Sequence, residues 1–119
     1  MNAYTTIIGN AGRNAELHTF ETGAKKASFT IAVKDDHNRE AEPTWFKVEA
    51  WNGYAEKVVE LVKKGREVVC SGQLRLESFY SEKESRYKTI PVIRLTQFHL
   101  CGPKPESEQQ IEAEELKAS

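Results

Sequence analysis

Apolar and polar residues alternate along most of residues 1–100 with a period of two, the spacing at which successive side chains of a β-strand point to opposite faces. Polar turns separate the alternating runs, which indicates a small all-β protein. The clearest run is KASFTIAVK, residues 26–34, whose apolar positions from Ala27 to Val33 predict a core-facing side. The expected strands are residues 4–9, 15–20, 26–34, 44–51, 67–79 and 86–100.

The period changes in residues 52–65, NGYAEKVVELVKKG, where apolar residues recur at helical spacing. Asn52 is expected to cap the start of this helix, and Gly65 to end it in the left-handed conformation. About five strands with a single helix between the third and the fourth is the layout of the OB-fold, a small Greek-key barrel. We therefore predict an all-β OB-fold whose helix covers one end of the barrel. Such barrels commonly bind oligonucleotides or oligosaccharides.

The last two expected strands are longer than a usual strand, which predicts a strongly coiled sheet or an arm that protrudes beyond it. Pro91 lies inside the last one, so that stretch is expected at a sheet edge or a bulge, because proline donates no backbone hydrogen bond. From Gly102 onward, large apolar side chains almost disappear. The expected organisation is one OB-fold domain over residues 1–102, followed by an acidic, disordered tail over residues 103–119.

The segment TWFKVEAWNG, residues 44–53, places large aromatic rings on a charged side of its strand. Period-two parity turns Phe46, Val48 and Ala50 toward the core. The opposite side carries Trp45, Lys47, Glu49 and Trp51. The same parity in residues 71–79 produces a side that carries Gln73, Arg75, Glu77 and Phe79. Both strands therefore predict an outward side on which aromatic rings alternate with charges.

Exposed rings interleaved with cations suit a single-stranded nucleic acid. Every nucleobase has a flat π-face that can stack on an aromatic ring when the base is unpaired, and each stack is worth roughly 1–3 kcal/mol. Lysine and arginine neutralise the phosphates, whereas the two carboxylates on the same sides count against phosphate contact. The sequence predicts stacking by Trp45, Trp51 and Phe79, and phosphate or polar contacts by Lys47, Arg75 and Gln73.

Other interpretations stay open at this point. A curved barrel can bury part of its outer side under the helix, the tail or a partner subunit, so each ring taken alone is equally well explained by packing. The protein would then be an OB-fold module that binds RNA or a protein partner through the same aromatic side. An enzyme is the remaining rival class. The sequence contains no nucleophile elbow, Walker loop or HExxH motif, so we expect no catalytic activity.

The distribution of charge leaves nucleic-acid binding open. Residues 1–102 contain 15 Lys and Arg against 13 Asp and Glu, a net charge of +2, whereas residues 103–119 contain 2 against 5, a net charge of −3. This faintly basic domain falls far short of the strongly basic surface that would argue for nucleic acid by itself. MNAYTTIIGN lacks the pattern of a signal peptide, and no apolar stretch is long enough to span a bilayer, so we expect a cytoplasmic protein.

The cysteines and histidines predict neither a disulfide nor a metal site. Cys70 and Cys101 are the only cysteines, and the sequence has no CxxC or Cys/His cluster. His18, His37 and His99 are scattered through different segments, without the spacing of metal ligands. A reduced compartment fits this composition, and no cofactor is expected.

Residues 5–100 resemble the bacterial single-stranded DNA-binding proteins. IIGNAGRNAEL, residues 7–17, is similar to the family's opening segment Val-Gly-Asn-Leu-Gly-x-Asp-Pro-Glu, and SFTIAV is similar to its second strand. TWFKVEAWNGYAEKVVELVKKGREVVCSGQLR resembles the central block, in which an aromatic strand leads into an Ala-Glu helix and then a Gly-Gln-Leu-Arg strand. RYKT, residues 86–89, resembles the start of the last strand. The order and spacing of these segments together make the resemblance specific.

The resemblance implies an OB-fold homotetramer that coats single-stranded DNA without sequence preference. It also implies a non-catalytic role in DNA replication, recombination and repair, in association with the nucleoid. The family's base-stacking aromatics correspond to Trp45, Trp51 and Phe79, the same rings that strand parity selects. A fourth stacking position falls on His37, and Arg75 matches a basic contact.

The sequence departs from the family pattern at several positions. Asn14 and Ala15 replace its Asp-Pro. Gly53, Glu77 and Ser78 stand where family members often place lysine or arginine, which lowers the expected number of phosphate contacts. The family usually ends in a run of aspartates followed by Ile-Pro-Phe, which recruits replication and repair proteins. This sequence ends in EAEELKAS, so it is expected to be truncated, to recruit partners differently, or to recruit none.

Overall fold

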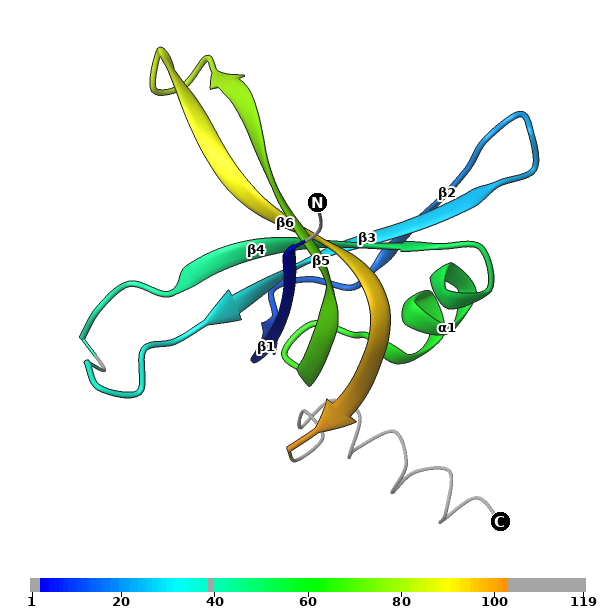
Figure 1. Ribbon diagram of the computed structural model, residues 1–119, viewed down its shortest axis with the longest axis horizontal. Coiled ribbons are helices and arrows are strands. Elements are labelled where there is room, and N and C mark those ends of the chain that lie inside the picture. Colours follow the sequence, from blue (N-terminus) through cyan, green and yellow to red (C-terminus); the bar gives the residue numbers. More distant parts are fainter. Residues whose placement is uncertain (1–2, 39, 103–119) are drawn as a thin grey trace, which may run out of the picture.

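The computed structural model describes residues 3–38 and 40–102, and within this range it consists of β-strands and one short α-helix (Figure 1). In chain order the elements are β1 (Ala3–Ala11), β2 (Glu16–Thr19), β3 (Lys25–Val33), β4 (Thr44–Trp51), α1 (Gly53–Leu61), β5 (Glu67–Ser81) and β6 (Arg86–Cys101). No helix in the described residues is long and apolar enough to cross a membrane. The predicted tail over residues 103–119 lies outside the described residues.

The strands close into a five-stranded barrel whose first strand is broken into two segments. The order across the sheet is β1-β5-β6-β4-β3-β2, and β1 also pairs with β3, which closes the barrel. β1 meets β3 at Asn10 and Ala11, and after a short break β2 continues alongside β3. Counted this way, α1 lies between the third and fourth strands of the barrel. The predicted OB-fold is therefore confirmed, and the extra strand is the second half of a broken one.

The inward sides of the strands form the hydrophobic core that the alternation predicts. Ala27, Phe29 and Ile31 of β3 are fully buried, and Val33 packs against the same cluster. The other elements contribute Ile7, Val48, Ala50, Ala55, Val58, Val68, Cys70 and Ile93. α1 packs against β2, β3 and β4, so the helix covers one end of the barrel and its apolar side completes the core.

The start of α1 differs from the prediction in its cap. Asn52 occupies the position before the helix, with φ 52°, but its side chain forms no capping hydrogen bond. Its Oδ1 instead accepts a hydrogen bond of 3.3 Å from the backbone N–H of Lys25. The backbone N–H of Asn52 donates to the carbonyl of Lys25 at 2.8 Å. Asn52 thus ties the end of β4 to the start of β3 rather than capping the helix.

The end of α1 comes earlier than predicted. The helix stops at Leu61 instead of reaching Gly65. After this point the backbone bonds to the broken first strand: Ala15 donates to the carbonyl of Val62 at 3.2 Å, and Gly65 donates to the carbonyl of Ala11 at 2.8 Å. Gly65 does adopt the expected left-handed conformation, with φ 86°. Tertiary hydrogen bonds therefore replace the last turn of the predicted helix.

β5 and β6 extend beyond the barrel as a two-stranded arm, as the lengths of the predicted strands indicate (Figure 1). The two strands pair along their whole lengths, whereas β4 pairs with β6 only opposite residues 92–94. Pro91 lies opposite Leu76, just outside the part of β6 that β4 covers. The predicted edge position of Pro91 is therefore confirmed.

Both cysteines are free thiols in the structure. Cys70 is buried in β5, and this burial, with a smaller effect from the neighbouring Cys101, raises the pKa of its thiol to about 12. The side chain therefore stays protonated near neutral pH, where it packs as a small hydrophobic group. Cys101 ends β6, and its Sγ donates a hydrogen bond of 3.1 Å to Glu67.

Candidate nucleic-acid interface

β4 presents its aromatic and charged side chains on the outer surface of the barrel. Val48 and Ala50 are fully buried in the core, and Phe46 packs against it, as parity predicts. The residues that alternate with them are Trp45, Lys47, Glu49 and Trp51. They therefore belong to the opposite side of the strand.

The outer side of β4 continues across its neighbouring strands. Residues directly opposite one another in a sheet share a face, and Lys47 lies opposite Thr30 of β3 and Val92 of β6. Val92 in turn lies opposite Arg75 of β5. We call this outer face of β3, β4, β6 and β5 the candidate face; it carries Lys26, Trp45, Lys47, Glu49, Trp51, Gln73, Arg75, Glu77, Phe79, Lys88 and Arg94. All predicted site residues except His37 lie on it.

Trp45 is an exposed ring near the start of β4. Its exposed fraction is 46 %. The ring rests on the backbone of Gly12, because a β-carbon placed on Gly12 would lie only 2.7 Å from Cζ3 of Trp45. The glycine therefore leaves room for the indole on the barrel surface, and the remaining exposed area is accessible to a ligand.

Trp51, at the other end of β4, is half-buried rather than fully exposed. Phe20 stacks against it, with ring centroids 5.8 Å apart and planes inclined by 15°. His18 meets Phe20 edge-on at 4.4 Å. The Lys26 ammonium and the Arg94 guanidinium lie 5.7 and 5.9 Å from the centroid of Trp51, within the range of cation–π attraction. Trp51 is thus part of a local cluster of rings and cations.

Sequence reasoning missed Phe20 and His18, which extend this end of the candidate face. His18 could have been identified if the register of β2, β3 and β4 were known, because His18 lies opposite Lys26 and Lys26 lies opposite Trp51. Phe20 comes from the turn after β2, where strand parity no longer applies. Together with Trp51, the turn between β2 and β3 forms a pocket lined by Phe20, Glu21, Thr22, Ala24 and Trp51.

Phe79 lies on the arm, beyond the barrel. Its exposed fraction is 47 %, and it lies opposite Lys88 of β6. Lys88 donates a hydrogen bond of 3.1 Å to Glu84 near the tip of the arm. The arm therefore carries the third predicted stacking ring on the candidate face, at a distance from the two tryptophans of β4.

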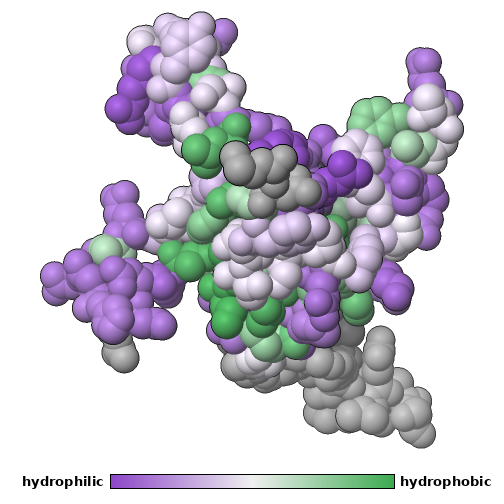
Figure 2. All heavy atoms as spheres, viewed as in Figure 1, coloured by the Kyte–Doolittle hydropathy of each residue, from purple (hydrophilic) through white to green (hydrophobic). Residues whose placement is uncertain are grey.

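His37 does not lie on the candidate face. It belongs to the loop between β3 and β4, where its backbone N–H donates to Oδ1 of Asp35 at 2.8 Å. This loop projects from the barrel in Figure 1, and Figure 2 shows the same region, at the left, as mostly hydrophilic. His37 is therefore exposed, but it does not share a face with Trp45, Trp51 and Phe79.

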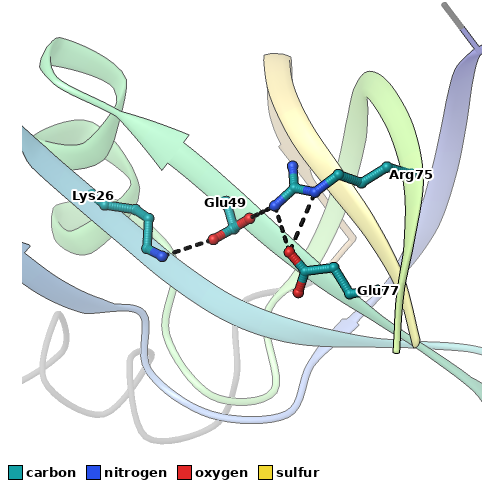
Figure 3. A network of polar contacts seen from close by, with 4 residues as sticks. All are labelled: Lys26, Glu49, Arg75 and Glu77. Carbon is teal, nitrogen blue, oxygen red and sulfur yellow. Dashed lines mark hydrogen bonds and ion pairs between the residues drawn. The ribbon is translucent and has the colours of Figure 1, made fainter. Parts of the chain in front are cut away.

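Four charged residues form a connected network on the candidate face (Figure 3), and one of them, Lys26, lies 5.7 Å from the ring centroid of Trp51. Glu49 lies at its centre and is only 3 % exposed. Lys26 of β3 binds one carboxylate oxygen of Glu49 at 2.9 Å, and Arg75 of β5 binds the other through Nη2. The same guanidinium binds Glu77 at 2.7 Å. The predicted phosphate contact Arg75 is therefore held by two carboxylates.

The network shifts the pKa values of Glu49 and Arg75. Burial raises the pKa of Glu49, but hydrogen bonds from Lys26 and Arg75, with the nearby charges of Lys26 and Lys47, outweigh it and hold the pKa below its ordinary value. The pKa of Arg75 is raised, mainly by its hydrogen bond to Glu77. Burial lowers this pKa, but by less. Glu49 and Arg75 are therefore charged near neutral pH, and the formal charges of the two acidic and two basic residues of the network sum to zero.

Three cations of the candidate face lie outside this network, and one of them, Lys88, is bound to Glu84. In the part of the chain that the structure describes, Lys47 and Arg94 form no ion pair. Lys47 is half-buried and Arg94 is exposed. Gln73 lies opposite Arg94 and places an amide beside it. Among the described residues, no group of three or more His, Cys, Asp or Glu side chains is arranged to hold a metal ion.

Comparisons with known proteins identify the family and several relatives of this chain. A family described as the Single-strand binding protein family matches residues 1–100. A Nostoc sp. protein named Single-stranded DNA-binding protein 1 is 31 % identical over 99 residues, which cover 83 % of this chain and 82 % of the relative. Its namesake from Synechocystis sp. is 33 % identical over 99 residues, 82 % of each chain.

A solved structure shares the fold. The small single-stranded DNA-binding protein from Streptomyces coelicolor superposes with a TM-score of 0.74 at 19 % identity, covering 84 % of this chain and 94 % of that one. The resemblance seen in the sequence is thus confirmed by relatives and by fold. Because the family match extends over residues 1–100, the chain belongs to the single-strand binding protein family.

Proposed function

We propose that this chain binds single-stranded DNA without sequence preference, by stacking unpaired bases on Trp45, Trp51 and Phe79. The observation that carries the proposal is the placement of these rings on one continuous face with Lys47 and Arg94. Its membership of the single-strand binding protein family supports the same conclusion. Stacking needs only the flat face of a base, so it tolerates any sequence but requires that the base be unpaired.

The role follows from this mode of binding. A protein that covers unpaired bases protects the single strands that arise during DNA replication, recombination and repair. The family consists of DNA-binding proteins, and we propose no catalytic activity for this chain. We also propose that it acts in the cytoplasm, in association with the nucleoid, where these strands are formed.

The cations contribute less than the rings in this proposal. Lys47 and Arg94 contact phosphates, and Gln73 adds a polar contact beside Arg94. Arg75 is already bound to Glu49 and Glu77, so the free chain offers it to phosphate only in part. Binding should therefore depend weakly on salt, because each neutralised phosphate contributes about −0.7 to the single-strand salt slope.

The decisive test is a titration of tryptophan fluorescence with poly(dT), duplex DNA and poly(U) at low and moderate salt. We expect poly(dT) to quench the fluorescence, because bases stack on Trp45 and Trp51, and duplex DNA to leave it unchanged. The salt slope should be shallow, about −1.4 if Lys47 and Arg94 each neutralise one phosphate. Stronger quenching by poly(U) would redirect the proposal to RNA. No response to any of the three polymers would leave a protein-binding module.

We further propose that the chain assembles as a homotetramer through the outer face of β1 and the adjoining start of β5, which meets the candidate face where Tyr4 lies opposite Gln73. Tyr4 and Ile8 of β1 are 65 % and 56 % exposed there, although both are large and apolar. Thr6 and Ser71, which share this face, are hydrogen-bonded at 2.8 Å. β1 pairs with β3 only at Asn10 and Ala11, so its first part has one edge that no described strand covers. Exposed apolar surface beside an open strand edge suits a second copy of the chain.

Sedimentation velocity tests the assembly. We expect a species near 54 kDa, four times the 13.5 kDa of one chain. Ile8→Glu should shift the distribution toward smaller species, because it places a charge in the apolar contact. Glu16→Gln, on exposed β2, is the matched control and should leave the assembly unchanged. A monomeric wild-type protein at micromolar concentration would rule out the tetramer.

A further inference from the structure

Glu49 is a buried carboxylate on a surface that otherwise suits phosphate. Charged side chains are rarely buried unless they are paired, and this one is paired twice. One oxygen is bound by Lys26 at 2.9 Å and the other by Arg75 (Figure 3). The two cations come from β3 and β5, on either side of β4 and β6 in the sheet. Glu49 therefore gathers cations from distant strands to one point.

This point lies where a bound strand would pass. Glu49 is two positions from Trp51 on β4, and Lys26 lies directly opposite Trp51, 5.7 Å from its ring. The side chains of Lys26 and Arg75 are 26 % and 47 % exposed, so both reach the surface from the buried carboxylate. A strand whose bases stack on the tryptophans brings its phosphates past these two cations.

We propose that Glu49 competes with DNA phosphate for Lys26 and Arg75, and so limits the strength and the salt dependence of single-strand binding. This inference rests on the proposed function. A guanidinium or ammonium already neutralised by a carboxylate displaces fewer counterions from the DNA than a free one. Glu77 adds a second competitor for Arg75, so the network as a whole presents no net positive charge to a phosphate.

The network also joins β3, β4 and β5, and a purely structural role predicts a different result. Loss of a structural ion pair lowers stability and, if it has any effect, weakens binding at every salt concentration alike. Release of two cations strengthens binding at low salt and steepens its salt dependence. The salt slope therefore separates the two roles.

The test is Glu49→Gln, which removes the charge but keeps the shape and one acceptor oxygen. We expect the slope of log K against log salt to become steeper by about 0.7 to 1.4, one unit of 0.7 for each phosphate that Lys26 and Arg75 neutralise. If both cations are released, an about tenfold increase in salt should lower the affinity for oligo(dT) by a factor about 25 times larger than in the wild type. Adding Lys26→Gln and Arg75→Gln to the variant should remove this increment.

Two further variants complete the design. Glu60→Gln, exposed on α1, changes the net charge equally and should leave the slope unchanged. Glu77→Gln tests the same competition at a residue whose side chain is 41 % exposed, so it avoids a buried substitution. It should steepen the slope by up to about 0.7, because only Arg75 is affected.

The outcomes are distinct. If the wild type binds oligo(dT), and if folded Glu49→Gln and Glu77→Gln have the same slope of log K against log salt as the wild type, the inference is overturned. The proposed function then stands. If Glu49→Gln fails to fold, Glu77→Gln decides alone by the same criterion. Failure of the wild type and of every variant to bind oligo(dT) at low salt overturns both. Binding by Glu49→Gln that is tighter at low salt and steeper than in the wild type supports the inference.

Discussion

Trp45→Ala is expected to weaken binding of oligo(dT) by about 5- to 150-fold, the loss of one base–aromatic stack worth about 1–3 kcal/mol. The ring is 46 % exposed and rests on Gly12, outside the hydrophobic core, so the barrel should keep its stability. Fluorescence anisotropy of a labelled oligonucleotide measures the affinity without depending on the tryptophan that is removed. The salt slope should stay the same, because the ring carries no charge.

The same measurement on Trp51→Ala tests whether the two rings act separately. They lie six residues apart on β4, about 20 Å at the rise of a strand, so they should contact different bases and their losses should add in the double variant. The loss at Trp51 is expected to be the smaller one, because Phe20 remains beside it.

The matched control for both is Tyr87→Ala. Tyr87 is 77 % exposed and pairs with Tyr80 across the arm, on the face opposite to Phe79. It should bind oligo(dT) like the wild type. If Tyr87→Ala weakened binding as much as Trp45→Ala, exposed aromatic area in general would explain the affinity, and the candidate face would lose its special role.

Parity within a strand is what the sequence predicts best here. Phe46, Val48 and Ala50 alternate with Trp45, Lys47, Glu49 and Trp51, and Val48 and Ala50 are buried as the alternation requires. Side-chain direction in a strand is a local property of the backbone, so the sides of β4 and β5 that carry the rings could be identified without knowing how these strands pair. The outward direction of Trp45 and Phe79 follows from this, whereas their placement on one face depends on the pairing of β6 with both strands.

Contacts between distant segments could not be predicted in this way. Parity places Glu49 on the outer side and suggests a solvated charge, yet it is 3 % exposed. Its burial depends on Lys26 and Arg75, which are brought together only by the pairing of four strands. The early end of α1 has the same origin, because Val62 and Gly65 bond to the broken first strand instead of continuing the helix.

The pairing that assembles the candidate face depends on two glycines at close backbone approaches. A β-carbon on Gly72 would lie 2.0 Å from the carbonyl oxygen of Arg94, and one on Gly9 would lie 2.2 Å from that of Ala32. Real β-carbons do not approach an oxygen so closely, so Gly72→Ala and Gly9→Ala must push paired strands apart. We expect each to destabilise the fold by roughly 3 kcal/mol or more, the upper range for overpacking. The corresponding fall in Tm is roughly 10–25 °C for a domain of this size, measured by thermal unfolding.

Gly53→Ala separates this cause from the general flexibility of glycine. Gly53 is the first residue of α1, and a β-carbon there would meet nothing within 4 Å. Alanine is favoured over glycine in a helix by up to about 1 kcal/mol, so this variant should unfold at the same temperature or a higher one. Equal losses in Gly53→Ala and Gly72→Ala would contradict the steric argument. A large loss in Gly72→Ala but not in Gly53→Ala would show that the close approach of β5 to the carbonyl of Arg94 needs a residue without a side chain.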